Sequence, residues 1–348
     1  MTVSRPLLVV VLAIALGGCD PFDGPESLMD EYVARTARVL DLEAELSVPA
    51  PVPGMPRRRL RQLDVPSLQI DMLGFLSLYG CQLQFVVGER NSVLGRVMQP
   101  LNRLRYELRF IQAARDCVPE IDNEELAQSV AEAADSKEQS LPVVIWNATW
   151  GVEEVEPLFT RSKGYLPVDS TGVTTASLGQ DVRRLNGTIE AILGGQLGED
   201  LGFVGAIHQQ WQSQHRAGQV LNSAALATAR LEDVADLLVQ RLDGRPLCIG
   251  GKENEQARIV RSMFFSIYIE KVQSYLADIR RARNELLEPL SELASLQADV
   301  MPEAFKGFHE EALEVDGEGI WHRLDQATDR HTSAWQDLLD QCGMRPSA

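Results

Sequence analysis

The chain has 348 residues, of which 45% are hydrophobic, and its 33 basic and 50 acidic side chains give a formal net charge of −17 at pH 7. This hydrophobic content excludes wholesale disorder and suits one large globular domain or two of average size. Because a surface this acidic repels phosphate groups, we expect no nucleic-acid partner and little attraction of the protein body to anionic lipid surfaces.

The first 18 residues are typical of a signal peptide. Ten unbroken apolar residues, Leu7 to Leu16, follow Arg5 in a segment without acidic residues. The run is too short to span a bilayer, which takes about 20 residues. The tetrapeptide Leu16-Gly17-Gly18-Cys19 resembles a bacterial lipobox. We therefore predict cleavage after residue 18 and attachment of a lipid to Cys19; the alternatives are an ordinary signal peptide with an incidental cysteine, or a short uncleaved anchor.

Residues 19–25 would then form a lipidated tether at the periplasmic face of a bacterial membrane. Anchoring by more than one acyl chain is stable, whereas a single chain binds reversibly. Since the acidic body has little reason to adhere to anionic lipids, the acyl groups must provide the attachment. Asp20 resembles the residue that keeps enteric lipoproteins in the inner membrane. This gives a slight preference for the inner over the outer membrane and leaves the choice open.

The first predicted helix covers residues 26–46, where apolar side chains recur among charged ones. Prolines between residues 48 and 56 deny the backbone its helical donors, so a loop or an extended strap should follow. It leads into Arg57-Arg58-Arg59-Leu60-Arg61, the one basic cluster of this acidic sequence, in which Arg57, Arg58 and Arg59 are the candidate contact residues. This cluster could contact lipid headgroups or an acidic partner. The interpretation that we favour is a solvated loop that pairs with the protein's own carboxylates.

Apolar side chains between residues 67 and 88 fit two structures. Spacings of three and four predict a helix, whereas a local alternation and two glycines would also fit strands, and we choose the helix. A second amphipathic helix is predicted over 100–117, and the acidic stretch 120–138 predicts an exposed one. Residues 26–162 would thus form an N-terminal helical part, followed by a loop over 163–178.

The strongest periodicities lie beyond that loop. Helices are predicted over about 200–243, 254–298 and 319–341, and the last repeats its apolar residues at alternating steps of three and four, as in the seam of a bundle. Three long helices in succession give an up-down-up arrangement. We therefore predict an all-α fold, an elongated helical bundle with long antiparallel helices and little or no sheet. Residues 179–348 would form a C-terminal bundle continuous with the N-terminal part.

Four further cysteines are present, an even number, as expected in a compartment that oxidises thiols. Of the three possible pairings, the geometry favours Cys81 with Cys117 and Cys248 with Cys342. Two antiparallel segments that turn near Pro100 would place Cys81 next to Cys117. An earlier turn, in the polar segment before Pro100, would not. The up-down-up order brings the other two to one end of the bundle. No CxxC spacing occurs, so neither a redox nor a zinc role is expected.

The stretch around the first cysteine pair resembles a known family. The residues that carry the resemblance are Pro56–Arg59, Gly80-Cys81, Gly88–Val97, Pro100, Arg103-Leu104, Tyr106-Glu107 and Cys117. The pattern is similar to that of uncharacterised proteobacterial lipoproteins, the domain of unknown function 3080 family. The length, the anchor and the later tryptophans also fit, so the resemblance covers nearly the whole mature chain. It implies no catalytic residue, because the family has no assigned activity.

Glu89, Arg90 and Asn91 are the first candidate for a site, because with the serine that follows they interrupt an apolar stretch. The alternative, which we favour, is structural. The side chain of Asn91 or of Ser92 could cap a helix by accepting from an exposed backbone donor, and Glu89 could pair with Arg90.

Trp146, Asn147 and Trp150 are the second candidate. Aromatic faces beside an amide can line a pocket for a sugar or a peptide. Two tryptophans spaced by four residues are more often part of a core, however, and this is the alternative that we favour.

The sequence contains no familiar catalytic or metal-binding motif. His208 and His215 are two helical turns apart, too far for a zinc pair, and His331 falls on the predicted seam as a core residue. Neither a phosphate loop nor a GxSxG elbow is present. We expect no cofactor, no metal and no enzymatic activity, but a scaffold or interaction protein of the cell envelope with an unidentified protein partner. The alternatives are a periplasmic ligand-binding module that uses Trp146–Glu156 and, third, an envelope hydrolase.

Overall fold

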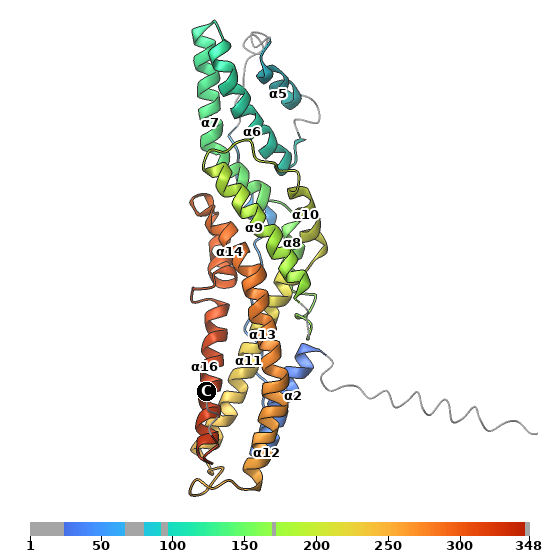
Figure 1. The fold of residues 1–348 in the computed structure, drawn as a ribbon, viewed down its shortest axis with the longest axis vertical. Helices are drawn as coiled ribbons and strands as arrows, with labels where there is room; N and C mark the ends of the chain where they lie inside the picture. Colours follow the sequence, from blue (N-terminus) through green and yellow to red (C-terminus); the bar gives the residue numbers. More distant parts are fainter. Residues whose placement is uncertain (1–23, 67–79, 92–96, 169–171, 345–348) are drawn as a thin grey trace, which may run out of the picture.

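The computed structural model describes residues 24–66, 80–91, 97–168 and 172–344. Within these ranges the chain forms an elongated assembly of helices without a strand (Figure 1). The predicted all-α fold, with long helices in a bundle, is confirmed. Among the described residues, no helix combines the length and the apolar character that crossing a membrane requires.

Helix α2 (Pro25–Leu40) is the first described element. Its buried face consists of Leu28, Met29, Tyr32, Val33, Thr36, Ala37 and Leu40. The helix ends short of the predicted residue 46 because Asp41 adopts a left-handed φ of 60° and its backbone N–H caps two carbonyls of the last turn. Residues 42–57, which we call the strap, then run without helix, as their prolines predict. The strap leads into the single turn α3 (Arg58–Arg61).

A tip of three helices forms one end of the molecule (Figure 1). Its elements are α5 (Gln82–Asn91), α6 (Pro100–Cys117), the short turn η3 (Val118–Glu120) and the first half of α7 (Glu124–Thr149). Helix α7 extends past the predicted end at residue 138, through Pro142, because its second half is apolar and buried in the main core. The predicted helix over 67–88 is described only from residue 80 onward; residues 67–79 lie outside the described ranges.

The middle of the molecule contains α8 (Val155–Leu158), α9 (Val173–Leu193) and α10 (Val204–Ser213). Helix α9 begins within the predicted loop 163–178, after Gly172 with its left-handed φ of 71°. The predicted helix over 200–243 is two helices, α10 and α11 (Arg216–Asp243). The break occurs because α10 packs against α8 while α11 packs against α2 and α16.

Three long helical rods, α11, the segment 255–295 and α16 (Ile320–Asp340), form the lower bundle in Figure 1. The second rod consists of α12 (Glu255–Met263), η4 (Phe264–Val272), α13 (Gln273–Ala282), η5 (Arg283–Leu287) and α14 (Glu288–Ser295). Two of these segments, η4 and η5, are π-helical. The short elements η6 (Ala298–Val300), α15 (Glu303–Phe308) and η7 (His309–Leu313) lead to α16. Helix α2 packs against α11, α12 and η4, which joins the N-terminal segment to this bundle.

Both predicted disulfides are confirmed. Cys81 and Cys117 join α6 to the residue before α5, with a Cα–Cα distance of 5.8 Å, and Cys248 and Cys342 close the lower end at 5.2 Å. Two hydrophobic clusters surround them: a small one in the tip around the first pair, and a large one that reaches from Leu28 to the second pair. The predicted division of the chain at residues 163–178 stays a prediction.

Candidate functional site

The basic cluster of the sequence is fastened to an acidic segment of the same chain. The buried Arg61 donates to the backbone carbonyls of Pro56 and Trp150 and to the carboxylate of Glu156. Arg58 donates from its backbone N–H to the same carboxylate over 3.1 Å and forms a longer ion pair, 3.4 Å, with Glu153. Burial lowers the pKa of the Arg61 guanidinium, and the neighbouring Glu156 carboxylate partly offsets this effect.

These contacts support the interpretation that arginines of the basic cluster pair with the protein's own carboxylates. Arg58 is half-buried, whereas Arg57 and Arg59 are exposed. The central residue is Arg61, the last arginine of the cluster. Its burial depends on the end of α7, which lies far away in the chain.

Trp146 and Asn147 bind the backbone of the segment that follows the strap, and Trp150 packs beside them. The Asn147 amide accepts from the backbone N–H of Leu63 over 2.9 Å and donates to its carbonyl over 2.7 Å, as a neighbouring strand would. Trp146 Nε1 donates to the Arg61 carbonyl over 2.7 Å. Both indole rings are fully buried and lie 5.1 and 4.9 Å from the ring of Phe305. The rings therefore expose no face to a ligand.

Glu89, Arg90 and Asn91 form the last turn of α5. The Glu89 carboxylate forms an ion pair with Arg109 of α6, with distances of 2.8 and 3.1 Å. Both side chains are more than half exposed, so the pair contributes at most about 1 kcal/mol. The suggested helix cap at Asn91 stays a prediction, because residues 92–96 lie outside the described ranges. This turn joins two helices of the tip.

A buried ion cluster in the tip was not identified from the sequence. Glu107 is fully buried and forms ion pairs with Lys137, at 2.5 Å, and with Arg103 one turn before it. The Lys137 ammonium also lies 5.1 Å from the ring centre of Tyr106. Burial lowers the pKa of Lys137, which the Glu107 carboxylate partly offsets, and burial raises the pKa of Tyr106 to about 12. The cluster is enclosed between α6 and α7, so it stabilises the tip and reaches no substrate.

A second enclosed cluster lies in the lower bundle. The Tyr32 hydroxyl is 2.6 Å from His331 Nε2 and accepts from Trp335 Nε1–H over 2.9 Å. The ring of Tyr268 stacks on that of Tyr32. His331 is fully buried, as expected for a residue on the seam, and burial lowers its pKa to about 3. A general acid or base must reach the proton that it transfers, and this imidazole is sealed from solvent.

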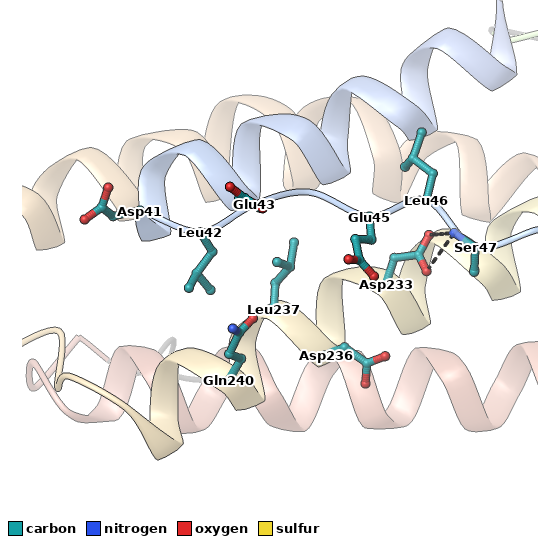
Figure 2. A pocket seen from close by; sticks show the side chains of 10 residues that line it. All are labelled: Asp41, Leu42, Glu43, Glu45, Leu46, Ser47, Asp233, Asp236, Leu237 and Gln240. Carbon is teal, nitrogen blue, oxygen red and sulfur yellow. Dashed lines mark hydrogen bonds between the residues drawn. The ribbon is translucent and has the colours of Figure 1, made fainter.

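An open acidic groove is the main surface feature next to the strap (Figure 2). It has a volume of about 730 Å³ and lies between the start of the strap and α11. Its lining residues are Asp41, Leu42, Glu43, Glu45, Leu46, Ser47, Asp233, Asp236, Leu237 and Gln240. Half of them are carboxylates, and Leu46 is 48% exposed between them.

Local contacts fix the walls of this groove. Asp233 accepts from the backbone N–H of Ser47, as Figure 2 shows, and forms an ion pair with Arg230. Arg230 in turn donates to the Ser47 carbonyl over 2.7 Å, so the strap is held at this point on both sides. Asp236 forms an ion pair with Arg330 of α16. The remaining carboxylates, Asp41, Glu43 and Glu45, are exposed.

The chemistry of these clusters does not resemble that of a metal centre. Among the residues that the structure describes, no three His, Cys, Asp or Glu side chains are grouped so that they could hold a metal ion. The groove instead offers a surface with dispersed negative charge and three leucines, of which Leu46 is the most exposed. Cys19 and Asp20, on which the predicted anchor and the membrane preference depend, lie outside the described residues.

Comparison with known proteins places the chain in a family without assigning it a role. No curated protein and no solved structure matches it. The model of one family, described as a protein of unknown function (DUF3080), matches residues 29–346 and so includes nearly every element described above. The chain therefore belongs to the DUF3080 family, as the pattern around its first cysteine pair indicates.

Proposed function

We propose that this protein is a lipid-anchored helical protein of the bacterial periplasm that acts, without catalysing a reaction, as a scaffold or interaction protein of the cell envelope. The lipobox-like sequence that ends in Cys19 supports the anchor. The acidic groove between the strap and α11 supports the interaction. For the choice of membrane, the sequence offers Asp20, with its slight preference for the inner one.

The groove is the observation that carries the proposal. Its exposed carboxylates, Glu43 and Glu45, attract a cationic segment electrostatically before contact. They repel acidic segments, so the groove selects a basic partner. The half-exposed Leu46 gives such a segment an apolar contact that strengthens as water is excluded. The partner that fits is an extended basic segment of another envelope protein, with one apolar side chain among its lysines or arginines.

The alternative roles have less support. A ligand-binding module built on Trp146–Glu156 needs accessible aromatic faces, whereas the rings of Trp146 and Trp150 are enclosed. A hydrolase needs acid and base groups that reach a substrate, whereas the Glu107 and His331 clusters are sealed inside the protein. The groove, in contrast, is open to a partner.

The interaction can be tested with a photo-crosslinking amino acid at position 46, inside the groove, in cells that produce the full chain. We expect a discrete adduct with an envelope protein. The double variant Glu43→Lys/Glu45→Lys should reduce this adduct roughly ten-fold, because each reversed charge costs about 0.5–1 kcal/mol of attraction at an exposed site. The variant Glu120→Lys/Asp122→Lys reverses two exposed charges in the tip and should leave the adduct unchanged. An adduct that both variants lower equally would contradict the proposal.

The anchor is tested in the same cells with Cys19→Ala. Mass spectrometry of the wild-type N-terminus should show a diacylglyceryl modification on Cys19, and the variant should leave the membrane fraction. An unmodified wild-type N-terminus would exclude the anchor, whatever the crosslinking result.

A further inference from the structure

A second groove lies beside the end of α2. It has a volume of about 310 Å³ and separates the end of α2 from the rod formed by α12 and η4. Its lining residues are Arg35, Arg38, Val39, Ile259, Ser262, Met263, Ser266 and Ile267. No carboxylate lines it, although the protein as a whole has a net charge of −17.

The chemistry of this groove differs from that of the acidic one. Arg38 is exposed, and Arg35 lies beside it with its Nε 2.6 Å from the Glu31 carboxylate. Ile259 is 47% exposed on the facing rod. Two guanidinium groups next to apolar side chains suit an anion that is joined to hydrocarbon, since guanidinium groups bind phosphate oxygens and apolar side chains favour hydrocarbon.

Helix α2 connects the groove to the N-terminal tether. It runs along the lower bundle (Figure 1), with its start near the middle of the molecule, where Glu26 accepts from the hydroxyl of Tyr165 over 3.5 Å. Its end lies at the lower end of the bundle, because the Val39 carbonyl accepts from Gln256 and the Leu40 carbonyl from Arg241. The tether therefore joins the flank of an elongated molecule.

The length of the tether limits how the molecule can be oriented. Six peptide units separate Cys19 from Pro25, and in any conformation they span at most about 20 Å. Helix α2 has 16 residues and is about 24 Å long, and the residues 244–254 extend the bundle beyond its end. A molecule that stood with its lower end on the membrane would hold Pro25 farther from the lipid than the tether can reach. The opposite end lies farther away still (Figure 1).

We infer that the molecule lies along the membrane on its α2 flank, with the groove between α2 and α12–η4 docked on anionic phospholipid headgroups. The inference rests on the proposed lipid anchor at Cys19. Of the two grooves beside α2, the acidic one is repelled by anionic headgroups, whereas Arg35 and Arg38 attract them. Charge outside about 8 Å is screened at physiological ionic strength, so these local arginines outweigh the net charge once the surfaces meet.

The test uses residues 19–348, produced without the signal peptide, with all four downstream cysteines oxidised. The free Cys19 thiol is coupled to a maleimide-bearing lipid in vesicles, either with phosphatidylglycerol or with phosphatidylcholine alone, and hydrogen exchange is measured by mass spectrometry. We expect at least three-fold slower exchange in peptides covering 25–40 and 255–267 on the anionic vesicles. Peptides covering 41–47, in the acidic groove, should exchange as they do on the neutral vesicles.

Two double variants distinguish vesicle binding through the groove from binding through other basic residues. Without coupling, Arg35→Gln/Arg38→Gln should bind the anionic vesicles roughly thirty-fold more weakly, since each basic residue near the surface contributes about 1 kcal/mol. Arg245→Gln/Lys252→Gln removes the same charge from the exposed lower end and should bind as the wild type does. Thermal unfolding confirms that each variant folds.

Three results would overturn the inference: protection of residues 244–254 instead of the groove, no difference between the two lipid mixtures, or equal losses in the two variants. Chemical coupling supplies the anchor independently of the cell. A protein that cells do not lipidate can therefore still dock through this groove, and the Cys19→Ala experiment reports on the proposed function separately.

Discussion

At the scale of the residue, burial determines the protonation of His331. Its imidazole is enclosed by Tyr32, Tyr268 and Trp335, and burial holds its pKa at about 3. The two tyrosines also titrate, but burial raises their pKa values above the ordinary value, so they remain neutral at and below neutral pH. The cluster is therefore neutral at neutral pH and ties α2 to α16.

This burial predicts that His331 makes the fold sensitive to acid. In the unfolded chain a histidine has a pKa near 6.5, so between pH 3 and 6.5 the folded protein binds fewer protons than the unfolded one. The contribution of His331 to stability is complete above about pH 6.5 and is lost as the pH falls toward 3. We expect His331→Gln to lower the free energy of unfolding at pH 7 by about 1–3 kcal/mol and to flatten its decline between pH 6.5 and 4.

Urea unfolding at a series of pH values measures this effect. The control is His322→Gln on the same helix, because His322 is exposed and its substitution should preserve both the stability and the pH dependence. A variant at position 331 with the wild-type slope would show that another group causes the acid sensitivity.

The residue types predicted that the basic cluster forms ion pairs with carboxylates and that Trp146 and Trp150 are part of a core. They did not indicate that Asn147 would hold the backbone of Leu63, or that Glu107 would be buried with Lys137. Each of these contacts joins residues 30 or more positions apart. Such partners depend on the folded path of the chain, which spacing along one helix does not contain.

At the scale of the element, α9 and the π-helical turn η5 approach each other without space for a side chain. A Cβ atom added to Gly179 would lie 1.7 Å from the backbone carbonyl oxygen of Glu285. The neighbouring Asn186 fastens the same pair of helices, because its amide donates to the Pro289 carbonyl over 3.0 Å. The glycine thus allows α9 to pack against the second rod.

Two alanine substitutions in α9 should therefore have opposite effects. Gly179→Ala forces two backbones apart and should destabilise the protein by about 2–3 kcal/mol, as overpacking of a core does. Gly187→Ala lies on the exposed side of the same helix with nothing near the added methyl group, and should stabilise the protein by about 0.5–1 kcal/mol. Urea unfolding of both variants measures the two effects. Equal effects would indicate that helix propensity, rather than the close approach, dominates at both positions.

The helix boundaries show where sequence periodicity fails. Helix α2 ends at Leu40 although apolar residues continue to Leu46. Residues 42–46 leave the helix and run beside α11 instead. The helix predicted over 200–243 is interrupted at Gln214, where the backbone is extended. In both places the apolar pattern continues while the packing partner changes. Periodicity detects the apolar face but does not identify the element that it meets.

At the scale of the whole molecule, two disulfides hold two separate cores. The pair Cys81–Cys117 belongs to the small cluster in the tip, whereas Cys248–Cys342 belongs to the large cluster that includes α2, α11 and α16. The two pairs close chain segments with sequence separations of 36 and 94 residues. Loss of each should therefore affect a different part of the molecule.

The variant Cys81→Ala/Cys117→Ala should lose roughly 4 kcal/mol of stability in the tip by the chain-entropy estimate for a loop of this length. Hydrogen exchange should accelerate in α5, α6 and the first half of α7, while α16 keeps its protection, because the cluster around Cys81–Cys117 contains no residue of α16. The matched variant Cys248→Ala/Cys342→Ala should accelerate exchange in α16 and the end of α11. Uniform acceleration in either variant would show that the two cores unfold as one unit.

The sequence by itself determined the helical class, the three long rods, both disulfide pairings and the family, because each depends on local periodicity, on the order of the elements or on a continuous motif. The tertiary structure alone decided where the strap is fastened, which charges are buried, and that one stretch of the chain lines both an acidic groove and a basic one. Arg35 and Glu43 belong to one continuous stretch of the chain, yet they line different grooves, because Arg35 faces the rod formed by α12 and η4 whereas the segment with Glu43 packs beside α11. The local charge that a partner contacts therefore depends on the packing of the helices. The net charge of the sequence does not show how the charged residues are distributed over the surface.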